Sequence, residues 1–379
     1  MPDLQGITWA HRRAVEPLTG TLQRFRAVHP EITVNWQVRS LHGFEFQSVP
    51  ELAAHYDLIV LDHPFCGEIA ASRCLLPRDD LEGSGHLFVG RSLESYSYGG
   101  SIWALPIDAA SQVAASRPDL LAKLDQPPPE TWDEVLGLGE RARAAGLRLA
   151  IGLKGVHGLM TFYFLCANLG RPCATELEAP FLDRPAAREA LTAMRALLAY
   201  CPNASLDWNS IDLHEALVSA DDLVYCPVVY CYATYAESEL RTPLRFSNLP
   251  GLCERSSAGS AIGGTGLGIS ARCRQPEAAL AYARFLAGAE LHKLFAEHHG
   301  QPARKEAWED SAIDRRFGNT FSGTRRSIET AWIRPRYLGY LKVQADGGNL
   351  VEAHLRGEIG ETVLLDCLDA LHRNAAAPG

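Results

Sequence analysis

Three histidines stand at positions of the chain where they could do chemistry. His11 follows the first predicted strand, His63 follows the third, and His157 begins a helix later in the chain. Histidine offers a hydrogen-bond donor and an acceptor near neutral pH, so it suits proton transfer, metal ligation or pairing with an anionic ligand. Each of the three could instead hydrogen bond the backbone at the end of a strand. The sequence leaves both interpretations open.

Carboxylates and aromatic rings add groups that recognise hydroxylated molecules. Asp62 and Asp108 end predicted strands, and their oxygens can accept hydrogen bonds from the hydroxyl groups of a sugar or polyol. Asp62 could equally cap the helix that starts near Pro64. Flat apolar rings suit the face of a sugar or of an aromatic ligand. The candidate rings belong to Trp9, Tyr230, Tyr232, Trp332 and Trp103, the last of which could instead lie in the core.

A glycine-rich stretch, residues 261–270, could bring backbone close to a ligand. Its Gly263, Gly264 and Thr265 lead into a strand and not a helix, so the stretch does not match the dinucleotide-binding fingerprint. Because glycine has no Cβ, another group can approach its backbone closely. We therefore predict that these three residues line a ligand cleft.

Two arginines, Arg334 and Arg336, flank a single proline near the end of the chain. Guanidinium groups bind carboxylates and phosphates through paired hydrogen bonds. This arrangement predicts contact with an anionic group, if the ligand has one. Ion pairs on the surface are the alternative.

The elements that must position these residues alternate between strand and helix. Strands are predicted at Gly6–Trp9, Ile32–Val38 and Tyr56–Leu61, with an amphipathic helix through Val15 and Phe25 after the first, and a polar loop before the third. The continuous apolar run at the third strand is typical of parallel sheets. This is the start of a doubly wound α/β fold, in which the carboxyl ends of strands face the ligand crevice.

A second series of elements follows. The pair Thr131 and Glu134 forms a capping box before a helix at Trp132–Ala145, and a strand is predicted at Leu147–Leu153. Further elements are predicted at Leu159–Leu169, Arg184–Leu198, Leu213–Ala220, Leu223–Val229, Ala261–Ser270 and Pro276–Ala287. Because no linker separates the two series, we expect two domains joined by several crossings of the chain.

Several local motifs, in their order, resemble a known family. They are Tyr56-Asp57-Leu58-Ile59-Val60 before Asp62, Trp103-Ala104-Leu105-Pro106, residues 129–134 (PETWDE), residues 263–270 (GGTGLGIS), and Pro276-Glu277-Ala278-Ala279. Over nearly the whole chain the sequence is similar to the family 1 extracellular solute-binding proteins, the carbohydrate-type binding components of ABC importers.

This resemblance implies a periplasmic-binding-protein-like clamshell of two α/β lobes, each built from discontinuous segments. By analogy, residues 1–105 and 262–310 form one lobe, residues 106–261 and 311–379 form the other, and the ligand cleft lies between them. The residues named above would form the wall of this cleft.

The sequence therefore predicts a protein that closes on a small polar solute, a sugar, polyol or small anion, with no cofactor and no metal. The first alternative is a cytoplasmic enzyme on the same fold, using His and Asp residues for acid–base or metal-assisted chemistry. A second is a regulatory or scaffold protein that senses a metabolite and needs a protein partner. The sequence lacks GxSxG, HExxH and P-loop motifs, which argues against the commonest hydrolases, proteases and nucleotide enzymes.

Composition bears on partners and location. The net charge of -9 provides no broad positive field for nucleic acid, and no apolar stretch is long enough to span a membrane. No signal peptide precedes Gly6 and the chain has ten cysteines, so we expect a cytoplasmic monomer whose cysteines are buried free thiols. A periplasmic or extracellular location is the alternative, and an ABC permease would then be the partner.

Overall fold

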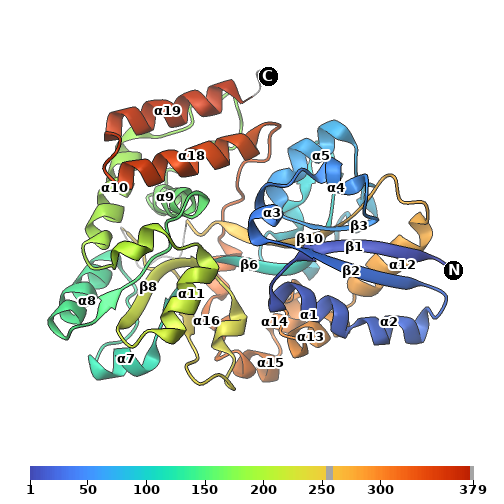
Figure 1. Cartoon of the computed structure of the whole chain (residues 1–379), viewed down its shortest axis with the longest axis horizontal. Helices are drawn as coiled ribbons and strands as arrows, with labels where there is room; N and C mark the ends of the chain where they lie inside the picture. The colour runs from blue at the N-terminus through green and yellow to red at the C-terminus, as the bar shows by residue number, and fades with distance from the viewer. Residues whose placement is uncertain (253–258, 376–379) are drawn as a thin grey trace.

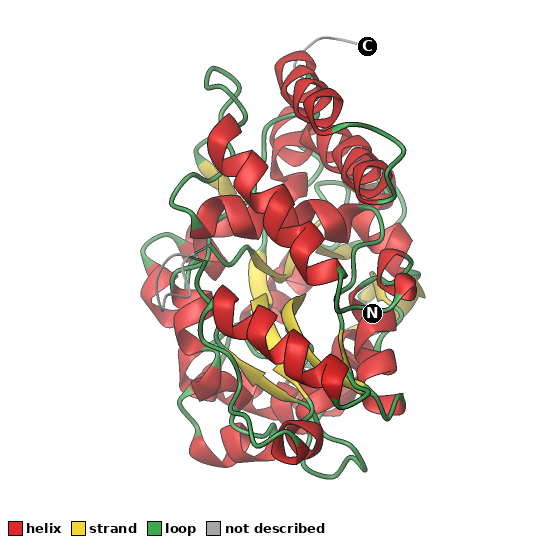
Figure 2. Cartoon of the chain, turned by 90° about the vertical axis from the view of Figure 1, so that its left-hand side faces the viewer, coloured by secondary structure: helices red, strands yellow, loops and turns green. Residues whose placement is uncertain are grey.

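The structure, a computed structural model, describes residues 1–252 and 259–375. Two α/β lobes lie side by side, and the long strand β6 (Leu105–Ser116) runs between them (Figure 1). The N-terminus lies at the outer end of one lobe, and the C-terminal helices lie on the other (Figure 1). Figure 2 looks onto the second lobe from its end and shows helices on the outside with strands between them. The predicted clamshell of two α/β lobes is confirmed.

The first lobe is built on a mixed sheet. Strand β1 (Asp3–Trp9) runs parallel to β2 (Thr33–Arg39) and to β3 (Leu58–Leu61), and β10 (Ile262–Ile269) lies antiparallel between β3 and β6. All four residues of β3 are buried, because helices cover both faces of the sheet. The parallel start predicted from the sequence is confirmed.

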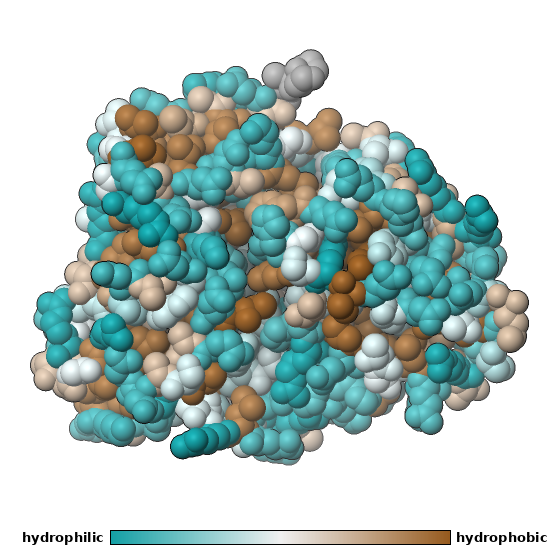
Figure 3. Space-filling model, viewed as in Figure 1, coloured by the Kyte–Doolittle hydropathy of each residue, from teal (hydrophilic) through white to brown (hydrophobic). Residues whose placement is uncertain are grey.

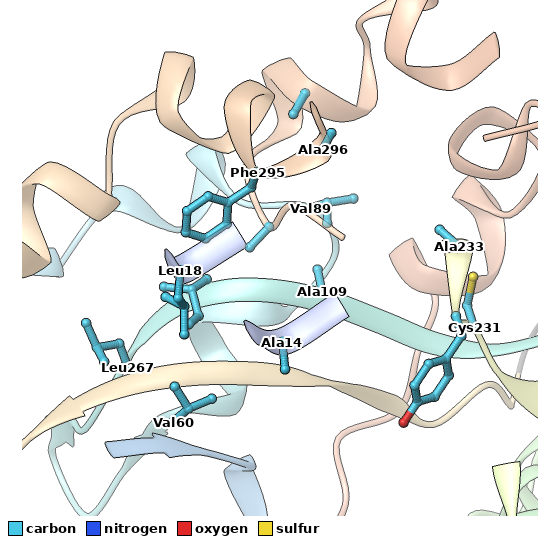
Figure 4. Packing of buried hydrophobic residues seen from close by; sticks show 14 of the residues in the cluster. Ala14, Leu18, Val60, Val89, Ala109, Cys231, Ala233, Leu267, Phe295 and Ala296 are labelled. Carbon is cyan, nitrogen blue, oxygen red and sulfur yellow. The ribbon is translucent and has the colours of Figure 1, made fainter. Parts of the chain in front are cut away.

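Alternate residues of β3 pack into two different cores. Leu58 and Val60 belong to the core beneath α1 (Arg12–Gly20), α2 (Leu22–Val28) and α13 (Ala289–Glu297). Ile59 and Leu61 belong to the core beneath α4 (Val49–Ala53) and α5 (Cys66–Ser72). Figure 4 shows the first of these cores, where Leu18 of α1 lies beside Phe295 of α13.

The second lobe continues the same sheet through β6. Strands β8 (Leu223–Tyr230) and β9 (Arg245–Ser247) pair antiparallel with β6, and β7 (Arg148–Leu149) runs parallel to β8. The helices of this lobe include α7 (Pro118–Lys123), α8 (Trp132–Ala144), α9 (Val156–Asn168), α10 (Arg184–Leu198), α11 (Ser210–Ser219), α18 (Tyr340–Leu355) and α19 (Glu361–Asn374). The capping box of Thr131 and Glu134 forms at the start of α8, as predicted.

Both lobes are assembled from segments far apart in the sequence. Strand β10 and helices α12 (Pro276–Leu286) and α13 return to the first lobe, where α12 packs on β10 and α13 on α1. Helix α18 packs against α9 and α19 in the second lobe. The remaining short elements are α6 (Ser92–Ser95), α14 (Lys305–Trp308), α15 (Ser311–Arg316), α16 (Thr320–Gly323), α17 (Arg325–Glu329), β4 (Ser97–Tyr98) and β5 (Ser101–Ile102).

Some predicted elements differ from the structure. The polar loop before β3 contains α4 and a further short helix, α3 (Leu41–Phe46), which begins where the Ser40 hydroxyl accepts a hydrogen bond from the backbone N–H of Gly43. The predicted strand Leu147–Leu153 forms a ladder only at β7. The first helix is interrupted at Thr21, whose hydroxyl donates to the carbonyl of Pro17.

Candidate functional site

A cavity of about 90 Å³ lies between the lobes. It has room for roughly six to nine water-sized groups. Figure 3 shows hydrophobic surface gathered near the boundary between the lobes on one face of the molecule. The cavity is lined by Trp9, Arg13, Leu41, Phe44, Glu45, Asp62, Pro64, Phe65, Ala110, Val156, His157, Met160, Ser210, Tyr230, Tyr232, Gly263, Gly264, Thr265, Arg334, Leu341 and Gln344.

The ends of strands supply much of this wall. Trp9 is the last residue of β1, Asp62 directly follows β3, and Tyr230 ends β8. Parallel strands such as β1 and β3 present their carboxyl ends at one edge of the sheet, so polar side chains that follow them gather there. Strand β8 is antiparallel to β6 and brings Tyr230 to the cavity from the second lobe. The second lobe adds the first turn of α9, with Val156 and His157.

The buried Arg13 of the lining is held by Asp108 and by a backbone carbonyl. Arg13 Nε donates to Asp108 Oδ2 at 2.7 Å, Nη2 donates to Oδ1 at 2.5 Å, and Nη1 donates to the carbonyl of Cys231 at 2.6 Å. Its guanidinium carbon lies 4.7 Å from the centre of the Tyr232 ring. Because a bidentate pair neutralises both charges, Arg13 fixes the wall without adding net positive charge to it.

A second buried arginine faces the cavity from the other side. Arg334 Nη2 donates to Asp62 Oδ2 at 2.5 Å, and Nη1 donates to Gln344 Oε1 at 3.1 Å. Burial alone would raise the pKa of Asp62, but the Arg334 guanidinium lowers it well below its usual range. Asp62 Oδ1 also accepts the backbone N–H of His63 at 2.8 Å. Asp62 therefore does both things considered from the sequence: it caps the turn that follows β3, and it lines the cavity.

Glu45 is the carboxylate of the cavity that lacks a charged partner within the described residues. Its Oε1 lies 3.8 Å from His157 Nε2. Burial, which is the largest cause, and the nearby charge of Asp62 raise the pKa of Glu45 to about 7. Burial lowers the pKa of His157 to about 4, so this imidazole is neutral near pH 7, with Nδ1 3.2 Å from Ser210 Oγ.

The raised pKa of Glu45 predicts a pH dependence of stability. A carboxyl whose pKa is higher in the folded than in the unfolded protein stabilises the fold fully below its unfolded pKa, and this contribution is lost as the pH rises through its folded pKa. Between pH 4.5 and 8 the loss from Glu45 amounts to about 2 to 3 kcal/mol. Glu45→Gln should remove this part of the pH dependence in urea unfolding experiments. The exposed Glu51→Gln variant on α4 is the control, and equal pH dependence in wild type and Glu45→Gln would contradict the assignment.

Four buried polar atoms in the wall have no hydrogen-bond partner among the described residues. They are Trp9 Nε1, Tyr230 OH, Thr265 Oγ1 and Arg334 Nε. Each such group costs about 1 to 3 kcal/mol when it is left without a partner. The wall therefore suits a molecule with several hydrogen-bonding groups.

Nine of the residues predicted from the sequence line the cavity. They are Trp9, Asp62, His157, Tyr230, Tyr232, Gly263, Gly264, Thr265 and Arg334. Gly264 also has a structural role, because its φ of +95° is strained for other residues and an added Cβ would lie 2.4 Å from the carbonyl oxygen of Asp108.

Four predicted residues lie outside the lining. His11 caps α1 by accepting the backbone N–H of Arg13, and burial lowers its pKa to about 4. Asp108 is turned to Arg13. His63 and Arg336 also lie outside the lining.

The anion site predicted for Arg334 and Arg336 does not form. Arg336 Nη1 donates to the carbonyls of residues 94, 95 and 97, at 2.9, 3.1 and 2.7 Å. The Arg336 guanidinium is therefore bound to backbone at the end of α6 and does not face a ligand. Arg334 is paired with Asp62.

His63 is fully buried, and burial lowers its pKa to about 4. Among the three predicted histidines only His157 lines the cavity, so the constellation that the enzyme alternative requires is not assembled there.

The sequence interpretation missed four polar residues of the wall: Arg13, Glu45, Ser210 and Gln344. Arg13 could have been found, because it lies in the first turn after β1 and falls under the same rule about strand ends. Glu45 lies in the segment interpreted as a loop. Gln344 reaches the cavity only through the packing of α18 on α9.

The two lobes, the sheet shared through β6 and the polar cavity between the lobes define a two-lobed solute-binding fold. A family model described as bacterial extracellular solute-binding protein matches residues 47–315. This is more than half of the chain, and the chain belongs to that family. It is therefore a solute-binding protein. No protein in the curated set matches the sequence.

Solved structures share the fold over essentially the whole chain. Maltose-bound MalE3 of T. maritima is 20% identical, with a TM-score of 0.82 and coverage of 98% of this chain and 99% of that one. A solute-binding protein of Thermotoga lettingae with bound alpha-D-tagatose is 15% identical, with a TM-score of 0.85 and coverage of 99% and 100%. One from Agrobacterium vitis with bound D-mannitol is 16% identical, with a TM-score of 0.79 and coverage of 99% and 98%.

Three further observations bear on the sequence expectations. Among the described helices, none combines the length and apolar character needed to cross a bilayer. Within residues 1–252 and 259–375, no group of three His, Cys, Asp or Glu side chains is arranged to hold a metal ion. The nine cysteines in this part of the chain are free, and five of them are buried. Cys253 lies outside the described residues.

Proposed function

We propose that the protein binds a sugar or polyol of about monosaccharide size in the cavity between its lobes. The observation that carries this proposal is the set of four buried polar atoms without partners, set among aromatic rings. A polyhydroxylated molecule offers both donors and acceptors to such atoms. Its apolar CH faces fit against flat rings.

Each part of the wall has a role in this binding. Trp9 Nε1 and Arg334 Nε donate to hydroxyl oxygens, whereas the carboxylate of Asp62 accepts from hydroxyl groups. The hydroxyl of Thr265 can do either. The rings of Tyr230 and Tyr232 cover the solute. Maltose, D-mannitol and alpha-D-tagatose in solved structures of the same fold support this class of ligand.

We further propose that residues 1–105 with 262–310, and residues 106–261 with 311–379, move as two lobes that close on the solute. Several contacts at the cavity run from one of these lobes to the other. Arg334, which contacts Gln344 of α18, reaches Asp62 at the end of β3, and Arg13 of α1 reaches the carbonyl of Cys231 beyond β8. Closure by hinge motion of two lobes is a common response to a ligand bound between them.

The description of the family bears on the place of action. We propose that the protein works as a monomer outside the cytoplasmic membrane and delivers its solute to the permease of an ABC importer. This is the alternative location considered from the sequence, and the description of the family as extracellular supports it.

Thermal denaturation and calorimetry with neutral sugars and polyols test the proposed ligand class. A ligand present at 100 times its Kd stabilises the protein by about 2.7 kcal/mol, which raises the Tm measurably. Small-angle scattering should show a smaller radius of gyration, and the solute should be recovered unchanged after incubation. A panel that leaves both Tm and scattering unchanged would contradict the proposal.

Two matched threonines locate the binding site. Thr265 and Thr8 are both buried on strands of one sheet and both have a hydroxyl without a partner among the described residues, but only Thr265 lines the cavity. Thr265→Val should weaken binding by about 2- to 13-fold, since one hydrogen bond contributes about 0.5 to 1.5 kcal/mol. Thr8→Val should leave the affinity unchanged. Equal effects of the two substitutions would place the solute elsewhere.

A further inference from the structure

The charges around the cavity do not balance. Arg13 and Arg334 are the cations of the lining, and Glu45 and Asp62 are its anions. Asp108, directly behind the lining, is a third carboxylate. With every carboxylate ionised, these groups sum to one excess negative charge, and His157 is neutral near pH 7 because its pKa is lowered to about 4.

Because the other charged groups are paired, the excess negative charge lies on Glu45. Asp108 neutralises Arg13 through two hydrogen bonds, and Asp62 neutralises Arg334 at 2.5 Å. Glu45 is left with His157 at 3.8 Å as its nearest ionisable contact. Arg39, whose Nε and Nη1 have no partner among the described residues, lies at the Phe44 ring but does not line the cavity. An anionic solute would therefore meet the Glu45 carboxylate without a free cation of the lining to bind it.

A buried carboxylate is tolerated when it has a charged partner. The side chain of Glu45 is 22% exposed and lines the cavity, so a bound solute can reach it. Glu45 follows Phe44, whose ring lies 4.8 Å from that of Trp9. The guanidinium carbon of Arg39 already lies 5.5 Å from the centre of the Phe44 ring. Aromatic faces attract cations, so the Trp9 ring is the one that favours positive charge beside the carboxylate.

We infer that the solute carries a protonated amine in addition to its hydroxyl groups, and that Glu45 binds this amine. The inference rests on the proposed function, because it takes the cavity to be the site of a sugar or polyol and adds one charged group to that ligand. The ligand class is then an amino sugar or an amino polyol. Arg334 Nε and Thr265 Oγ1 remain available for its hydroxyl groups.

Matched probes separate the charge of the ligand from its shape. One set is 6-amino-6-deoxy-D-glucose, D-glucose and D-glucuronate, and the other is D-glucamine, D-glucitol and D-gluconate. Each set keeps its carbon chain and changes one terminal group from amine to hydroxyl to carboxylate. Calorimetry at pH 8, where Glu45 is ionised, should give at least tenfold tighter binding of the amine than of the neutral member in at least one set. Neither carboxylate should bind.

Glu45→Gln should abolish this selectivity. In that variant the amine and neutral members should bind within twofold of each other, whereas Glu51→Gln on the exposed side of α4 should behave as wild type. Neutral members that bind as tightly as the amines, or a preference that survives in Glu45→Gln, would overturn the inference and leave the proposed function standing. Absence of binding by all six probes would overturn both.

A pH series provides a second readout. The groups facing Glu45 are Asp62, Arg334 and His157, together with Tyr230 and Tyr232, whose pKa burial raises to about 12. None of them changes its principal charge state between pH 8 and 5.5. With a pKa of about 7 for Glu45, the ionised fraction falls about 30-fold at pH 5.5, and affinity for the amine should fall with it. The affinity of Glu45→Gln should stay constant over this range. A pH-independent affinity in wild type would contradict the role of Glu45.

Discussion

Arg334→Met is expected to abolish binding and to lower the free energy of unfolding by about 3 to 5 kcal/mol. The substitution leaves the Asp62 carboxylate, which is half-buried at the cavity wall, without its cation, and breaking a buried pair in this way costs about that amount. It also removes the donor to Gln344 and the free Nε at the cavity wall. Urea unfolding and calorimetry with the tightest sugar or polyol measure the two effects.

Arg336→Met is the matched control, two residues further along the same segment. Arg336 binds backbone carbonyls at the end of α6 and does not line the cavity. Its loss should reduce stability but leave affinity within twofold of wild type. If Arg336→Met weakened binding as much as Arg334→Met, the anion site predicted from the sequence would have to be reconsidered.

Arg13→Met is expected to have a comparably large effect on stability, about 3 to 5 kcal/mol, because it strands Asp108 at 7% exposure. The loss of its contact with the Cys231 carbonyl also loosens the wall at Tyr232. The double variant Arg13→Met/Asp108→Asn removes the stranded charge and should recover part of the loss in urea unfolding.

The neighbouring Arg12 distinguishes this buried pair from a general effect of losing an arginine. The Arg12 side chain is 39% exposed, and its contacts with Glu16 and Glu237 are 3.7 and 3.8 Å long. The pair with Glu16 is exposed, and such pairs contribute about 0 to 1 kcal/mol. Glu237 is buried but has a closer contact with His299 at 2.6 Å, so Arg12→Met should cost much less than Arg13→Met. Equal losses for Arg12→Met and Arg13→Met, or no recovery in the double variant, would contradict the account of the pair.

The fold could be predicted because its signals are local and repeated. The apolar run of β3 matches a strand buried on both faces, and the alternation of strands and helices matches the parallel start of the sheet. The rule that parallel strands end at one edge of the sheet located Trp9 and Asp62 at the cavity, since they stand at the end of β1 and directly after β3. The positions of the strand ends were therefore enough to predict part of the cavity wall.

The other site residues depend on tertiary packing. Arg334 and Arg336 lie in one irregular segment, and their partners, Asp62 and the end of α6, come from distant parts of the chain. Neither partner could be assigned from the sequence alone. Glu45 lies on a short helix with no strong periodicity, and its carboxylate matters because the other charges of the cavity are paired.

The most direct test of the central claim is a crystal structure of the protein with the tightest-binding sugar or polyol, or its amine. The predicted result is ligand density between the lobes, with oxygen atoms within hydrogen-bond distance of Arg334 Nε and Thr265 Oγ1 and, for an amine, nitrogen beside Glu45. Ligand density in the separate groove lined by His11 and Tyr235, with the cavity between the lobes unchanged, would contradict the claim.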